Sequence, residues 1–183
     1  NLDSEAYVLF CKSVLNNIKG AVKKDANVLW NVSYNQKSPL EYILVVWEAI
    51  NMGYKLHETI CWVKSAAIPQ SIRLTRKFEF IFLLNQSTAE TPPTNQGYQE
   101  PEYNVWNISN QNANTAHHGA CFPVALPHKG ISLFCLKDIV LEPFCGSGTT
   151  MVASHQLNRR CYAMEIDPKY CQVTVDRMRK LDP

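Results

Sequence analysis

The stretch VLEPFCGSGTTMVAS, residues 140–154, constrains the fold more than any other part of the chain. An apolar run ends in Glu142 and a proline, two glycines then flank a serine, and two threonines open an alanine-containing segment. Gly146 and Gly148 permit backbone torsions that other residues avoid, and they let a ligand come close to the main chain. The order strand, glycine turn and helix predicts a ligand cradle at the carboxyl edge of a parallel sheet.

The spacing around this turn narrows the class of ligand. Met151 stands where the dinucleotide pattern has its third glycine, and no Gly-Lys-Ser/Thr follows as in a P-loop. Glu165 lies 19 residues beyond Gly146, near the end of the apolar run CYAMEID, where an acid can accept hydrogen bonds from ribose hydroxyls. These features indicate an adenosine cofactor that carries an amino acid, and S-adenosylmethionine fits that description. The alternative is that the glycines only turn the chain and that Glu165 is a solvated strand end.

Helical and strand patterns alternate along the chain, which predicts an open, mostly parallel α/β sheet. Turn signals and capping residues bound most of these segments. Helices are expected at 4–19, 38–53, 123–135, 148–157 and 168–180, and strands at 26–34, 54–64, 77–85, 103–109, 139–144 and 161–166.

Composition indicates a globular protein of one domain over residues 1–183, because 46% of the residues are hydrophobic and 19% are charged. The net charge of +2 permits a nucleic-acid partner without arguing for one. No apolar run approaches the roughly 18 residues of a membrane span. The polar segment 86–115 reads as a surface insertion suited to target recognition, and the same composition is equally typical of a disordered polar loop. Because the chain begins with Asn1 inside a helical pattern, we expect a processed or truncated N-terminus.

The cysteines bear on location and on metals. All seven fall singly, without a C-x-x-C pair or a Cys/His cluster at zinc spacing, so no metal site is expected. Free thiols of this kind are typical of a reducing cytoplasm.

Three motifs resemble those of the beta-type DNA amino-methyltransferases of restriction-modification systems. EPFCGSGTT (142–150) is similar to the cofactor loop of that family, and YAMEIDPKY (162–170) to its ribose-binding strand. HGACFPVALP (118–127) resembles the segment that lines the methionine end of the cofactor. The resemblance implies a Rossmann-like S-adenosylmethionine-dependent methyltransferase fold, with a mostly parallel sheet, one antiparallel hairpin and helices on both faces. This sequence differs from the family's usual pattern at Glu142, where Asp is commoner, and at Gly119, where Pro is commoner.

The resemblance also assigns roles to residues. It implies a cofactor-binding set comprising Phe144, Gly146, Ser147, Gly148, Thr149, Thr150, Glu165, His118, Ala120, Phe122 and Pro123. For DNA contact the basic residues of the loop before the strand at 77–85 are candidates, namely Lys64, Arg73, Arg76 and Lys77. The same charges would also suit a solvated loop.

The family's catalytic tetrapeptide, Asp/Asn/Ser-Pro-Pro-Tyr/Phe, does not occur in the chain. No catalytic residue is therefore assigned. The expected reaction is methyl transfer from S-adenosylmethionine to an exocyclic amine, cytosine N4 or adenine N6, of a flipped base in duplex DNA. A methyltransferase of RNA or of another substrate, and a non-catalytic cofactor-binding module, are the alternatives. Expected partners are duplex DNA, a second copy of the chain and a cognate restriction endonuclease.

Overall fold

The computed structural model describes residues 3–33, 38–67, 74–89, 102–110, 121–135 and 137–181. His118, Ala120, Arg73 and most of the segment 86–115 lie outside these ranges. The chain divides into two compact units, the first formed by 1–63, 76–93 and 99–106 and the second by 64–75, 94–98 and 107–183. One domain over 1–183 stays a prediction.

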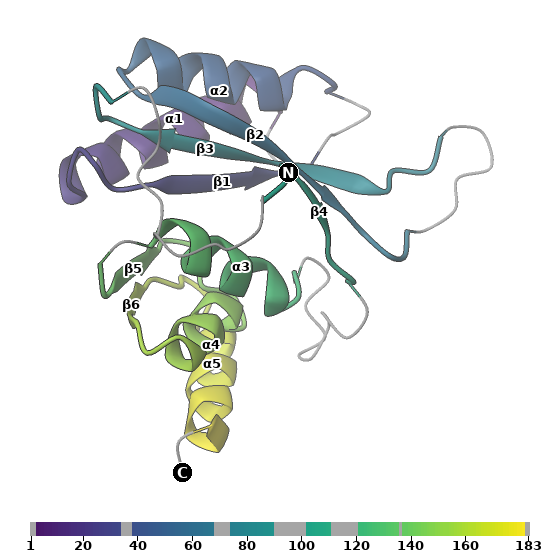
Figure 1. The fold of residues 1–183 in the computed structure, drawn as a ribbon, viewed down its shortest axis with the longest axis vertical. Coiled ribbons are helices and arrows are strands. Elements are labelled where there is room, and N and C mark those ends of the chain that lie inside the picture. Colours follow the sequence, from purple (N-terminus) through teal and green to yellow (C-terminus); the bar gives the residue numbers. More distant parts are fainter. Residues whose placement is uncertain are drawn as a thin grey trace. The chain divides into compact units, whose positions relative to one another are not determined.

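The first unit contains a four-stranded sheet with the order β1-β3-β2-β4 (Figure 1). Its strands are β1 (Val28–Val32), β2 (Lys55–Val63), β3 (Phe78–Asn85) and β4 (Val105–Asn107). Because β3 is antiparallel to both β1 and β2, those two strands run in the same direction with β3 between them. The β2–β3 pair is the antiparallel hairpin that the sequence predicts.

The central position of β3 follows from its sequence. Its five residues from Ile81 to Asn85 are all buried, as expected of a strand with neighbours on both edges and packing on both faces. In register, Trp30 of β1 lies opposite Phe82, and Thr59 of β2 lies opposite the same residue from the other edge.

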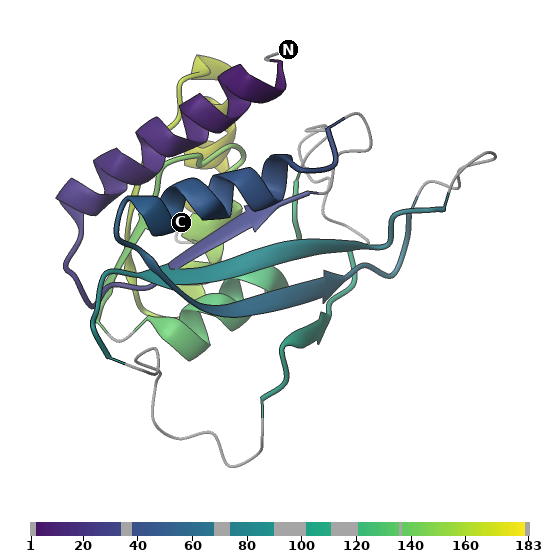
Figure 2. The same ribbon diagram turned by 90° about the horizontal axis from the view of Figure 1, so that it is seen from above.

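Two helices of the first unit, α1 (Ser4–Ala21) and α2 (Glu41–Asn51), cover one face of this sheet (Figures 1 and 2). The Asp3 carboxylate caps α1 by accepting a hydrogen bond from the Ala6 N–H. Gly53, with a φ of 91°, turns the chain from α2 into β2. The core between helices and sheet comprises Cys11, Leu15, Val32, Val45, Val46, Ala49, Tyr54, Phe82 and Leu84.

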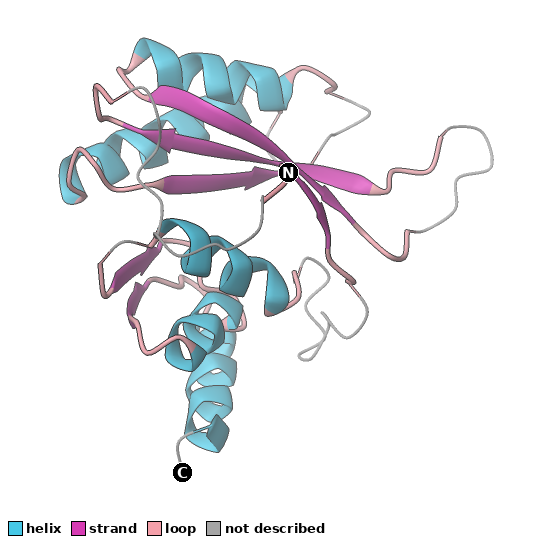
Figure 3. Cartoon of the chain, in the orientation of Figure 1, coloured by secondary structure: helices cyan, strands magenta, loops and turns pink. Residues whose placement is uncertain are grey.

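The second unit is a parallel strand pair with helices (Figure 3). Its elements are α3 (Ala125–Phe134), β5 (Ile139–Glu142), α4 (Thr149–Gln156), β6 (Arg160–Ala163) and α5 (Pro168–Leu181). The chain passes from β5 through α4 to β6, the crossover expected of parallel neighbours. None of the helices in the described part of the chain is long and apolar enough to cross a membrane.

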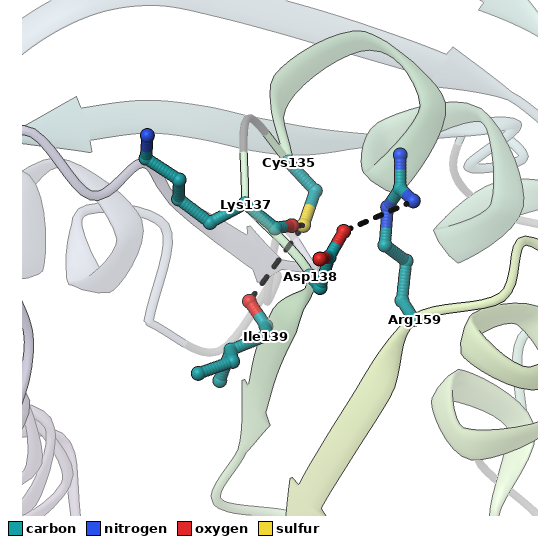
Figure 4. A network of polar contacts seen from close by, with 5 residues as sticks. All are labelled: Cys135, Lys137, Asp138, Ile139 and Arg159. Atoms are coloured by element: carbon teal, nitrogen blue, oxygen red, sulfur yellow. Dashed lines mark hydrogen bonds and ion pairs between the residues drawn. The ribbon is translucent and has the colours of Figure 1, made fainter.

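Polar contacts fix the beginnings of β5 and β6 (Figure 4). The Arg159 guanidinium lies 3.4 Å from a carboxylate oxygen of Asp138, and the Arg160 N–H donates to the Asp138 carbonyl. On the side of β5, the Cys135 thiol donates to the carbonyl of Lys137. These bonds set the register in which the two strands reach the glycine turn.

Several element boundaries differ from the sequence prediction. The helix expected at 38–53 begins at Glu41, because residues 38–40 form a turn in which the Glu41 N–H donates to the Ser38 carbonyl. The strand expected at 161–166 ends at Ala163. Its last residues leave the ladder to follow the glycine turn, where the Met164 carbonyl accepts from the Cys145 N–H.

Candidate cofactor site

The glycine turn leaves β5 and enters α4 within a few residues. Gly146 and Gly148 have φ values of 53° and 79°, in the left-handed region that glycine occupies at little cost. Gly148 is also the N-cap of α4. A Cβ atom on Gly146 would meet nothing within 4 Å, whereas one on Gly148 would lie 2.7 Å from Cγ2 of Thr174. The Cβ side of Gly146 is thus open, whereas the Cβ side of Gly148 is closed by α5.

Glu142, the last residue of β5, ties the two ends of the turn together. Its Oε1 accepts from the Phe144 N–H at 2.8 Å, and its Oε2 accepts from the Thr150 hydroxyl at 2.7 Å. One carboxylate therefore joins the strand end to the first turn of α4.

Glu165, just beyond β6, holds the turn from the other strand. Its Oε2 accepts from the Gly146 N–H at 2.7 Å, and its Oε1 accepts from the N–H groups of Ile166 and Asp167, both at 2.9 Å. A carboxylate offers about four acceptor positions, so these three bonds leave one.

The same bonds change the acidity of Glu165. The N–H of Asp167 is the largest influence that lowers the pKa of this carboxyl, burial opposes it, and the N–H groups of Gly146 and Ile166 lower it further. A lowered folded-state pKa means that the carboxylate stabilises the fold above the unfolded-state pKa. That contribution is lost as the pH falls through the folded-state value.

Helix α5 braces the turn from the side of its carbonyl groups. The Thr174 hydroxyl donates to the Gly146 carbonyl at 3.0 Å. Nη1 of Arg177 donates to the Ser147 carbonyl at 3.1 Å and to Oγ1 of Thr149 at 3.2 Å. The turn is therefore held by acids at its N–H groups and by α5 at its oxygens.

The hydroxyl groups of three predicted cofactor-binding residues are engaged within the protein. Ser147, Thr149 and Thr150 are 3%, 5% and 7% exposed. Oγ of Ser147 lies 3.4 Å from the Cys121 thiol, and the two threonine hydroxyls contact Arg177 and Glu142. The backbone N–H groups at the start of α4 are left for a ligand.

Phe122, Pro123 and Phe144 are the other predicted cofactor residues within the described ranges. Phe144 is 51% exposed beside the turn, Phe122 is half-buried and Pro123 is buried. Cys121 reaches Ser147, so the described part of the HGACFPVALP motif contacts the turn. The binding roles of all these residues stay predictions.

Three of the predicted DNA-contacting residues lie within the described ranges. Lys64 follows Val63, the last residue of β2, and Arg76 and Lys77 precede Phe78, the first residue of β3. Val63 and Phe78 are register partners across the hairpin. Arg76 and Lys77 are exposed, and Lys64 is half-buried. Their contact with DNA stays a prediction.

Sequence reasoning missed three residues of the site: Glu142, Thr174 and Arg177. Glu142 carries a signal, because an acid that ends a strand before a glycine turn can bond the N–H groups of that turn. Thr174 is the only buried residue of α5. For Arg177 the sequence offers no signal, because its partners lie 28 and 30 positions away.

Strand, left-handed glycine turn, helix and an acid on the neighbouring parallel strand together define a Rossmann-like ligand-binding unit. No cluster of three or more His, Cys, Asp or Glu residues suited to a metal ion occurs in the described ranges.

Comparison with known proteins gives the family. The chain belongs to the N6/N4 DNA methylase family, whose model matches residues 1–176. It is 34% identical over 141 residues to the type II methyltransferase M.Cfr9I of Citrobacter freundii, covering 71% of this chain and 46% of that protein. It is 31% identical over 156 residues to M.SmaI of Serratia marcescens, covering 76% and 53%. The chain thus spans about half the length of the curated relatives it matches. The family that the motifs indicate is confirmed.

Solved structures give the fold. The cytosine-N4-specific PvuII DNA methyltransferase matches with a TM-score of 0.82 and 22% identity, covering 97% of this chain and 72% of that one. The M1.HpyAVI complex with S-adenosylmethionine matches with a TM-score of 0.73 and 22% identity, covering 91% and 81%. These likenesses confirm the predicted fold class.

Replacement of Gly148 tests the closed side of the turn. Gly148→Ala forces an alanine into the left-handed backbone conformation and brings its Cβ against Cγ2 of Thr174. We expect this variant to lower the free energy of unfolding by about 2–4 kcal/mol. Adding Thr174→Ser removes Cγ2, the closest atom, and should recover part of the steric cost, while Oγ and Cβ of residue 174 stay close and the torsional cost remains. Chemical denaturation measures both variants. Unchanged stability of Gly148→Ala would contradict the packing described.

Proposed function

We propose that the protein transfers a methyl group from S-adenosylmethionine to the exocyclic amine of cytosine (N4) or adenine (N6) in duplex DNA. Membership of the N6/N4 DNA methylase family supports the reaction, as do relatives named type II methyltransferases. The observation that carries the proposal is the open space at Gly146 next to an ionised Glu165 that keeps one acceptor position.

The described turn fits S-adenosylmethionine in shape and in chemistry. A Cβ at Gly146 would occupy the open space beside the turn, so glycine there lets the methionine portion lie against the backbone. The first N–H groups of α4, at Thr149 and Thr150, suit a carboxylate, because a helix N-terminus favours anions. The remaining acceptor position of Glu165 suits a ribose hydroxyl.

Residues beside the turn complete the proposed pocket. Phe144, Ser147 and Gly148 would line the methionine portion, and His118, Ala120, Phe122 and Pro123 would close the amino-acid end. Because the hydroxyls of Ser147, Thr149 and Thr150 are engaged within the protein, these three residues would bind through the backbone.

In the proposed reaction the cofactor and the residues of this pocket have different roles. The bound cofactor supplies an electrophilic methyl group on a sulfonium. The residues of this chain hold that cofactor at a fixed distance and orientation, which is a large part of catalysis when one group is transferred between two bound partners. The target base has to leave the stack before its amine can reach the methyl group. No residue of this chain is assigned as the acceptor of the amine protons.

Cations near the β2–β3 hairpin would bind the DNA backbone. Arg76 and Lys77 are exposed, and Lys64 follows β2, whereas Arg73 lies outside the described residues. Contacts of this kind make DNA affinity fall steeply with salt. The polar segment 86–115 would read base edges, and its amide side chains suit hydrogen bonds to adenine.

The proposal also includes a protein partner and a location in the cell. A cognate restriction endonuclease is proposed because the relatives are named type II methyltransferases. A cytoplasmic location is proposed because all seven cysteines are unpaired.

A second copy of the chain is proposed to bind the outer face of α2. The apolar residues of this face recur at helical spacing and are all more than two-fifths exposed: Leu40, Ile43, Leu44, Trp47 and Ile50. Large contiguous apolar surfaces are rare on monomers and often mark interfaces. Beside it, Lys12 of α1 and Glu48 of α2 form an ion pair of 2.7 Å, so a two-fold related copy would meet both charge signs.

Methyl transfer from radiolabelled cofactor to duplex DNA, followed by identification of the modified base, tests the proposed reaction. We expect N4-methylcytosine or N6-methyladenine from the full-length protein. Gly146→Val fills the space beside the turn and should abolish cofactor binding and transfer. Gly20→Val is the matched control, because Gly20 also has an unoccupied Cβ position but lies in α1. Label in RNA or protein, or none in any substrate, would refute the reaction.

The ribose role of Glu165 is tested by calorimetry. Glu165→Ala should weaken S-adenosylmethionine binding by about 1–3 kcal/mol, the usual consequence of stranding hydrogen-bonded polar groups. Asp176→Ala, which removes an exposed acid from α5, is the control and should bind normally. Equal affinities of the two variants would show that Glu165 does not contact the cofactor.

Sedimentation equilibrium tests the proposed dimer. Trp47→Glu places a charge within the exposed stripe and should shift the protein from dimer to monomer, because a buried unpaired charge opposes association. Leu181→Glu, at the exposed end of α5, should leave the dimer intact. A wild-type protein that is monomeric at micromolar concentration would exclude this interface.

A further inference from the structure

The contacts between α5 and the glycine turn are more specific than packing requires. Thr174 and Arg177, one helical turn apart on α5, reach Gly146, Ser147 and Thr149 through three hydrogen bonds. We propose that Thr174 and Arg177 are positioning residues of the cofactor site, which hold the carbonyl side of the turn so that its N–H side faces the ligand. For the identity of that ligand the inference rests on the proposed function.

Peptide geometry gives the reason that Thr174 orients the site. In a planar trans peptide the C=O and the N–H of the next residue point in opposite directions. When the Thr174 hydroxyl holds the Gly146 carbonyl, the Ser147 N–H is turned away from α5. The Ser147 N–H makes no hydrogen bond to another residue of the described part of the chain. It is therefore a donor whose direction Thr174 sets.

The neighbouring N–H groups of the turn are already used. The Phe144 N–H bonds Glu142, the Gly146 N–H bonds Glu165, and the Gly148 N–H donates to the Cys145 carbonyl at 2.9 Å. These bonds close the turn on itself. A ligand that lies against the turn can thus be bound by the Ser147 N–H and by the first N–H groups of α4, and these are the groups nearest to the contacts from α5.

Arg177 extends the same restraint into α4. A single nitrogen of its guanidinium bonds the Ser147 carbonyl and Oγ1 of Thr149, so the peptide before Gly148 and the first residue of α4 move together. Hydrogen bonds from a charged donor are stronger than neutral ones. The planar guanidinium also fixes its donors in direction, which a lysine ammonium does not.

The packing of α5 supports a role at the turn. Thr174 is the only buried residue of this helix, and its methyl group lies 2.7 Å from the position that a Cβ on Gly148 would take. Arg179, two positions beyond Arg177, has a side chain that is 76% exposed and lies 4.0 Å from Asp176. Two arginines of one helix thus differ in whether they touch the turn, which provides a matched pair for experiment.

The test compares Arg177→Met, Arg177→Lys and Arg179→Met in the full-length protein, at a temperature where circular dichroism shows all three folded. We expect Arg177→Met to raise the dissociation constant for S-adenosylmethionine about tenfold, because a charge-assisted bond is lost from the turn. Arg177→Lys should recover part of this loss, and Arg179→Met should bind as the wild type does. In methyl transfer, the change should fall on KM for the cofactor more than on kcat.

Thr174→Val and Thr174→Ser test the second positioning residue. Valine removes the hydroxyl at nearly constant shape, so the Ser147 amide should lose most of its chemical-shift response to S-adenosylmethionine. Serine keeps the hydroxyl and should preserve that response. Equal affinities of Arg177→Met and Arg179→Met, together with an unchanged Ser147 response in Thr174→Val, would overturn the inference.

A measurement without ligand separates this inference from the proposed function. If wild-type protein fails to bind S-adenosylmethionine, the cofactor assignment fails by itself. The restraint by α5 is then judged from hydrogen exchange of the Gly148 amide, which Arg177→Met should accelerate and Arg179→Met should not. Equal exchange in the two variants would overturn the restraint.

Discussion

The second unit depends on holding an unfavourable backbone turn in one shape. Gly146 and Gly148 remove the steric cost of the left-handed conformation, but they also leave the turn flexible, because glycine has the largest conformational entropy to lose. The structure compensates with hydrogen bonds from three directions. Glu142 and Glu165 bind N–H groups, and α5 binds carbonyl oxygens. The two glycines make the turn flexible, and hydrogen bonds from residues distant in sequence remove that flexibility.

The two acids have different tasks, although both lie at the carboxyl ends of neighbouring strands. Glu142 uses its two oxygens within the turn, one for the Phe144 N–H and one for the Thr150 hydroxyl. Glu165 is bound by three N–H groups, which keep it ionised and keep its carboxylate in place. An anion positioned by the backbone needs no further reorganisation when a hydroxyl group approaches it. That makes Glu165 the better candidate for direct contact with a ligand.

Much of this arrangement could be predicted from sequence, because it is local. The pattern VLEPFCGSGTT predicts a strand, a turn and a helix, and these are β5, residues 146–148 and α4. The insertion of β3 between β1 and β2 could not be read from periodicity, since strand order depends on pairing between distant segments. Arg177 was missed for the same reason, because a helical pattern of charged residues does not say which charge faces another element. The local pattern narrowed the ligand to an adenosine cofactor that carries an amino acid, which S-adenosylmethionine fits, and the family resemblance implied the same ligand.

The hydroxyls of the turn show that residues of a binding motif can also have structural partners. Ser147, Thr149 and Thr150 resemble ligand-binding groups in sequence, yet each is buried and directed at a protein partner. A buried hydroxyl without a partner would destabilise the fold. The hydrogen bonds within the protein are therefore as good a reason for these residue types as ligand binding is. The groups that remain for recognition are backbone N–H donors, which every residue except proline provides. The motif therefore specifies the shape of the turn, and that shape determines which backbone donors a ligand can reach.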